Sequence, residues 1–119
     1  MNRPVILRRL AQAEFDDAAD WYEGQRAGLG TAFTAAIRQL LVDLGTWPEA
    51  HPEVHDDVRE ALVPRYPYAI YYRADPGQVT VLAVFHTLRQ QLAKRADQFN
   101  QNRRRSNQRI KEIGRREKN

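Results

Sequence analysis

The sequence predicts an α+β domain in which an antiparallel helical hairpin packs on an antiparallel sheet, in the element order βααβββ. Apolar residues recur at helical spacing through the first half of the chain, and the hydrophobic period changes to two after residue 57. The length of 119 residues suits one compact domain. We therefore expect one domain at 1–99, followed by a polar, basic extension at 100–119.

The first half is expected to form one strand and two helices. Residues 5–10 are a short apolar-to-basic run typical of a strand. Apolar side chains then recur at helical spacing over 11–22, and a second apolar stripe follows over 29–44. Because few residues separate the two stripes, the helices should form an antiparallel hairpin.

Glycine and proline mark the expected ends of these helices. Gly24 and Gly28 should end the first helix, and Gly45 should end the second. Pro48 and Pro52 prevent the second helix from continuing, because proline lacks the backbone N–H that a helix needs.

The second half is expected to form a three-stranded meander. The runs 58–63, 68–73 and 78–85 are rich in β-branched and aromatic residues and are separated by short Pro- and Gly-containing turns. Strands joined so closely pair antiparallel, and the N-terminal strand can join the edge of this sheet. From residue 88 to 99 apolar residues return to helical spacing, which predicts a C-terminal helix or a basic tail.

The charge of the chain is divided unevenly. Residues 1–93 hold nine basic and twelve acidic side chains, whereas residues 94–119 hold ten basic and three acidic ones. A strongly basic end predicts an anionic partner, so Arg103, Arg104 and Arg105 are candidate nucleic-acid contacts. The alternative is a disordered segment that only improves solubility.

Several functions are excluded or disfavoured by composition. The absence of cysteine excludes disulfides, thiolate zinc sites and cysteine nucleophiles, and no apolar run approaches the ~20 residues of a membrane span. We therefore expect a cytoplasmic protein without a membrane, metal or cofactor. His51 and His55 have a spacing that can bind zinc on a helix, but the neighbouring prolines favour a solvated turn. The acidic cluster of the first helix is interpreted as its solvated face and the tryptophans as packing residues at the hairpin: Asp16, Asp17, Asp20, Trp21 and Trp47.

The strand motifs, taken in order, have a recognisable arrangement. They are Val58 with Arg59, the turn Arg65, Tyr66, Pro67 and Tyr68, then Ile70 with Tyr72, and the strand 79–84 followed by His86 and Arg89. Over residues 5–95 the sequence resembles the RelE/ParE superfamily of toxins from bacterial type II toxin–antitoxin modules.

This resemblance implies a growth-inhibiting toxin, of the kind linked to plasmid stabilisation, that a cognate antitoxin neutralises. RelE-like members cleave mRNA on the ribosome without a metal, whereas ParE-like members inhibit DNA gyrase and are not known as enzymes. The fold alone cannot choose between these activities. A degenerate, non-toxic member kept as a binding module is the alternative from another class.

The residues offer a candidate site for RNA cleavage. Such a reaction needs a base, an acid and cations that stabilise the phosphorane. His86 titrates near neutral pH, and it could act with these residues: Arg89, Arg59, Arg65 and Tyr68, with Arg73 as a phosphate contact. RelE-like sites depend on several lysines and arginines, however, and residues 1–93 contain no lysine. Histidine is also common as a structural residue at a strand end, so both interpretations stay open.

Overall fold

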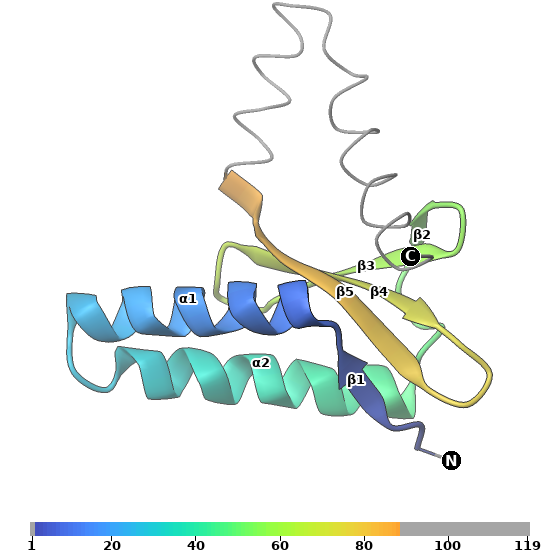
Figure 1. The fold of residues 1–119 in the computed structure, drawn as a ribbon, viewed down its shortest axis with the longest axis horizontal. Helices are drawn as coiled ribbons and strands as arrows, with labels where there is room; N and C mark the ends of the chain where they lie inside the picture. The colour runs from blue at the N-terminus through green and yellow to red at the C-terminus, as the bar shows by residue number, and fades with distance from the viewer. Residues whose placement is uncertain (1, 89–119) are drawn as a thin grey trace, which may run out of the picture.

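The computed structural model describes residues 2–88, which form one layer of sheet covered on one face by a helical hairpin (Figure 1). The elements in order are β1 (Val5–Leu7), α1 (Arg9–Gln25), α2 (Leu29–Thr46), β2 (Glu53–His55), β3 (Val58–Leu62), β4 (Tyr68–Ala74) and β5 (Val79–His86). No helix among these residues is long and apolar enough to cross a membrane. Residues 89–119, and with them the predictions for Arg89, Arg103, Arg104, Arg105 and the domain boundary at 99, lie outside the described part.

The predicted α+β fold is confirmed, with two additions to the sheet. The strand order is β1-β5-β4-β3-β2, so the meander β3-β4-β5 is present and the N-terminal strand joins its edge. β1 runs parallel to β5 while all other pairs are antiparallel, which makes the sheet mixed. The segment interpreted as a solvated turn contains the short strand β2, which pairs with β3 across a turn where Asp56 has a φ of 48°.

The main core lies between the hairpin and the sheet. The helices contribute buried side chains at helical spacing, among them Phe15, Phe33 and Ile37, and the sheet contributes Ile70 and Tyr72. A second buried cluster alternates with the first along the strands and therefore belongs to the other face of the sheet: Val58, Ala69, Tyr71, Leu82, Ala83 and Phe85.

The turn between the helices depends on a carboxylate. Gly28 precedes α2 with a φ of 92°, a left-handed conformation that glycine adopts without strain. Glu23 accepts hydrogen bonds from the N–H groups of Gly28 and Gly30, both at 3.0 Å, where a helix N-terminus favours negative charge. α1 ends at Gln25, between Gly24 and Gly28, as predicted.

α2 ends at Thr46, one residue after Gly45, so the predicted end of this helix is confirmed within one residue. The role of Gly45 is close approach: a Cβ at this position would lie 2.7 Å from the Arg3 carbonyl oxygen. The Arg3 N–H donates to the Gly45 carbonyl at 2.9 Å, so the absence of a side chain lets the entry to β1 lie directly against the end of α2.

The two tryptophans are not packing residues. Trp21 is 58% exposed and Trp47 is 68% exposed, so most of each indole faces solvent. Trp21 keeps an edge contact with Tyr22, with the ring centroids 5.1 Å apart. Neither indole belongs to a buried core cluster.

Candidate functional site

Tyr68 and His86 form the last residue pair of the β4–β5 ladder, at the end of the sheet where β5 finishes. Their rings meet edge to face with centroids 4.9 Å apart. His86 Nδ1 accepts a hydrogen bond from the Leu88 N–H at 3.2 Å. Because Nδ1 is an acceptor, the proton of the neutral imidazole is assigned to Nε2.

Helix α1 supplies the other wall of this site. A hollow of about 420 Å³ is lined by Tyr68 and His86 on one side and by Glu14, Asp17, Ala18 and Trp21 on the other. Glu14 Oε1 accepts the Val84 N–H at 3.0 Å, which ties the helix to the strand beside the hollow. The lining therefore combines two carboxylates with three ring side chains, and its helical wall is acidic.

Arg59 does not join this hollow. Its guanidinium donates to the carbonyl oxygens of His51 at 2.6 Å and Glu49 at 3.3 Å, and to Glu53 Oε1 at 3.1 Å. These bonds hold the segment between α2 and β2 against β3. Its strand position pairs with Tyr72 rather than with the end of β4 that carries Tyr68.

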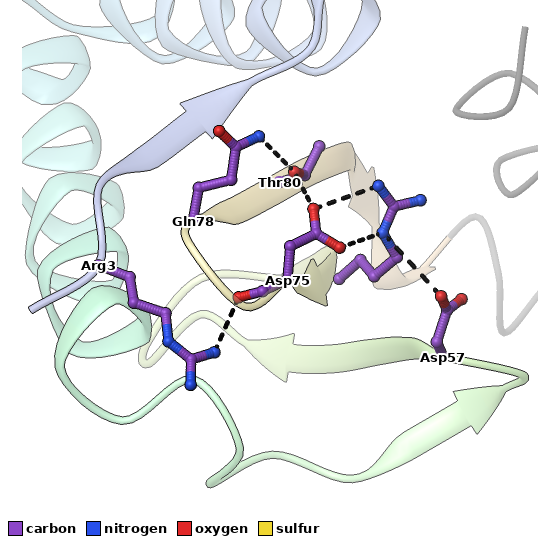
Figure 2. A network of polar contacts seen from close by, with 6 residues as sticks. Arg3, Asp57, Asp75, Gln78 and Thr80 are labelled. Carbon is purple, nitrogen blue, oxygen red and sulfur yellow. Dashed lines mark hydrogen bonds and ion pairs between the residues drawn. The ribbon is translucent and has the colours of Figure 1, made fainter.

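Arg73 is held at the opposite end of β4 by the polar network of Figure 2. Arg73 Nε donates to Asp75 Oδ1 at 2.5 Å, and Thr80 Oγ1 donates to Asp75 Oδ2 at 2.7 Å. Arg3 donates to the Asp75 carbonyl at 3.0 Å. The hydrogen bond from Arg73 is the largest cause that lowers the pKa of Asp75 below its ordinary value of 3.8. Arg73 is five positions after Tyr68 along the strand, a distance of roughly 16 Å at strand rise.

Arg65 lies in the turn between β3 and β4, at the same end of the sheet as Tyr68. It is exposed and has a φ of 71°, the left-handed conformation that side chains rarely adopt. Of the predicted site residues that are described, the structure thus brings Tyr68, His86 and Arg65 to one end of the sheet. Arg59 and Arg73 are elsewhere and stabilise the fold.

Comparison with known proteins decides the family. Residues 5–91 match the family described as the ParE toxin of the type II toxin–antitoxin system, parDE. The chain belongs to the ParE toxin family.

The fold of this ParE-family toxin is also found in a solved structure. That structure is described as the chromosomal ParDE TA system from P. aeruginosa. It is 16% identical, with a TM-score of 0.54 over 71% of this chain and 95% of the other. No curated protein matches this chain.

Sequence reasoning missed the helical wall of the hollow in this ParE-family chain. Asp17 was assigned to a solvated helix face and Trp21 to packing, yet both line the hollow with Glu14 and Ala18. The positions 14, 17, 18 and 21 follow helical spacing, which is the signal that could have grouped them. Within the described residues, no cluster of acidic or histidine side chains is arranged to hold a metal ion.

Proposed function

We propose that this ParE-family toxin arrests growth by binding DNA gyrase, and that a co-encoded antitoxin neutralises it in the cytoplasm. The observation that carries the proposal is that two of the cations predicted to act with His86 lie away from it. RNA cleavage needs cations where charge develops on the phosphorane. Two arginines that the sequence offered for this purpose, Arg59 and Arg73, are engaged in the fold.

The charge of the hollow supports the same conclusion. Asp17 lies on the helical wall of the hollow, and its carboxylate repels an approaching phosphate. A protein surface as partner has no such requirement for cations. The exposed indole of Trp21 is a suitable contact for a protein partner, because tryptophan is enriched in protein interfaces.

RNA cleavage remains the second candidate because of one observation. Tyr68 and His86 are in contact, and Arg65 lies in the turn before Tyr68, so an acid–base pair and a cation share one end of the sheet. A non-toxic binding module is the third candidate. A protein of this class would neither inhibit gyrase nor cleave RNA.

The test combines two assays with the purified full-length protein and with cells that express it. We expect the protein to inhibit supercoiling of relaxed plasmid by DNA gyrase without ribosomes, and the antitoxin to restore supercoiling. Full supercoiling activity together with cuts in translated mRNA would establish RNA cleavage instead. Normal growth with soluble protein accumulating would assign the chain to the binding modules.

A further inference from the structure

The helical wall of the His86 hollow belongs to an acidic helix. Over its length, α1 carries five acidic side chains and one basic side chain: Glu14, Asp16, Asp17, Asp20, Glu23 and Arg9. Glu14, Asp16 and Glu23 each accept a hydrogen bond within the fold. Asp17 is exposed, and among residues 2–88 its carboxylate accepts no hydrogen bond and makes no ion pair. The hollow is thus lined by a carboxylate whose charge the described part of the chain does not offset.

Aromatic rings surround this carboxylate. Asp17 and Trp21 are four positions apart on α1, so their side chains lie on the same face of the helix, and both line the hollow. Trp21 presents most of its indole to solvent. The rings of Tyr68 and His86 form the wall that the sheet contributes. The hollow, of about 420 Å³, therefore combines an exposed carboxylate with three ring side chains.

A positively charged side chain with an apolar stem matches this lining. A cation over the face of an aromatic ring is attracted by the ring quadrupole, and tryptophan is the strongest partner of this kind. The carboxylate of Asp17 adds an ion pair, while the stem of a lysine or arginine covers apolar surface. Arginine fits best, because its planar guanidinium can stack on an indole while its N–H groups donate to a carboxylate.

We propose that the hollow binds an arginine side chain from the surface of the toxin's protein target, with the guanidinium against the Trp21 indole and paired with Asp17. The identity of that target rests on the proposed function, whereas the match to arginine rests on the lining itself. Asp17 and Trp21 are both exposed, as the contacts of a reversibly bound partner must be in the free protein. Arginine is also enriched in protein interfaces.

NMR of the full-length toxin tests the cation site without the target. The probe is N-acetyl-argininamide, and its neutral isostere N-acetyl-citrullinamide is the control ligand. We expect the arginine probe to shift the Trp21 indole N–H signal saturably and to leave that of Trp47, the second exposed tryptophan, nearly unmoved. Asp17→Asn should weaken binding of the probe at least about 3-fold, because the ion pair is lost. Asp20→Asn, an exposed carboxylate of α1 outside the lining, should bind within about 2-fold of wild type.

Two results of this titration would overturn the proposal. An unmoved Trp21 signal, or equal binding of the arginine and citrulline probes, would show that the hollow does not select a cation. Binding that appears only after Arg89→Gln would show that the chain's own basic end supplies the arginine, since Arg89 follows His86 by three residues. That result would exclude an external partner.

Inhibition of supercoiling tests the same residues with the whole target. We expect Trp21→Ala and Asp17→Asn each to raise the toxin concentration for half-inhibition of gyrase about 10-fold. The matched controls Trp47→Ala and Asp20→Asn should stay within about 2-fold of wild type, with denaturant unfolding to verify that all four variants are folded. Folded hollow variants as potent as these controls overturn the proposal. A wild-type toxin that leaves gyrase active but still binds the arginine probe would contradict only the proposed target.

Discussion

His86 combines a hydrogen bond within the protein with a place in the lining of the hollow. Nδ1 accepts the Leu88 N–H, and the ring edge contacts Tyr68. Its position is that of a histidine that ends a strand, which is a structural role, although its place in a hollow also permits a proton transfer. Substitution separates these roles.

We expect His86→Gln to stay folded, to arrest growth like wild type and to inhibit gyrase supercoiling, because no proton is transferred in that activity. If the protein cleaves RNA, the same change should lower the cleavage rate about 10²–10⁴-fold. The control is His51→Gln, a half-buried histidine that faces Tyr72 rather than the hollow. Loss of toxicity by folded His86→Gln alone would favour the ribonuclease.

Asp75 gives a prediction for pH. Its pKa is lowered in the folded state, chiefly by the hydrogen bond from Arg73. The ionised carboxylate therefore adds to the free energy of unfolding above about pH 4, and this stabilisation is lost as pH falls through the lowered pKa. At pH 7 we expect Asp75→Asn to lower the free energy of unfolding by about 1–3 kcal/mol, because Arg73 and Thr80 lose a charged acceptor. Denaturant titrations should therefore show wild type and variant converging towards pH 2. The exposed Asp43→Asn is the control, and a constant difference across pH would contradict the linkage.

The sequence was enough to predict that Tyr68 and His86 lie together, but it did not predict the other contacts of the candidate site. The pairing of Tyr68 with His86 follows from the meander, because the strand lengths and turns set the register. The partners of Arg59 and Arg73 could not be predicted, because those arginines bind carbonyls and carboxylates that the tertiary fold brings to them. The rotation of α1 that brings Trp21 to the hollow is likewise fixed by packing on the sheet.

At the scale of elements, the helical hairpin is joined by close backbone contact rather than by side chains alone. A Cβ at Gly30 would lie 2.7 Å from the Ala19 carbonyl oxygen and 2.9 Å from the Glu23 Cβ. The N-terminus of α2 is therefore set directly on α1, in the position where Glu23 reaches its amides. Gly24, in the last turn of α1, has nothing within 4 Å of the corresponding point.

These two glycines make a matched pair for a stability measurement. We expect Gly30→Ala to lower the free energy of unfolding by about 1–3 kcal/mol, because the helices must separate to admit the methyl group. Gly24→Ala should instead raise it by about 0.5–1 kcal/mol, because alanine favours the helix. Denaturant unfolding of both variants measures the difference. Equal effects of the two substitutions on the free energy of unfolding would show that helix propensity, rather than the close approach of α1 and α2, determines the effect at Gly30.

The helices and strands could be predicted where apolar residues kept one period over many residues. Helical and alternating patterns located α1, α2, β3, β4 and β5. β2 was missed because Pro52 and its short polar flanks are typical of a turn, while its pairing with β3 is tertiary. The parallel direction of β1 also has no local signal, since it depends on where the hairpin returns the chain.

At the scale of the whole molecule, charge divides the chain into an acidic body and a basic end. Residues 1–93 carry three more acidic than basic side chains, and residues 94–119 carry seven more basic than acidic ones. Binding to polyanions should therefore depend on the basic end, and within it on Arg103, Arg104 and Arg105, whose nucleic-acid contacts remain a prediction.

We expect the triple substitution of Arg103, Arg104 and Arg105 to Gln to elute from a heparin column at clearly lower salt than wild type, because fewer counterions are released on binding. A triple substitution in the body, of Arg26, Arg38 and Arg65 to Gln, removes the same charge and is the control. Equal elution shifts for the two triple variants would assign polyanion binding to net charge alone.

The parallel pairing of β1 with β5 affects how the toxin forms during translation. Nearly the whole described chain separates Val5 from Val79, so the first strand to leave the ribosome waits for the last before it can pair. Until then β1 has no strand partner, and the sheet of the nascent chain is incomplete. The toxin fold is therefore completed only after β5 has been translated, so growth arrest should begin after translation rather than on the nascent chain.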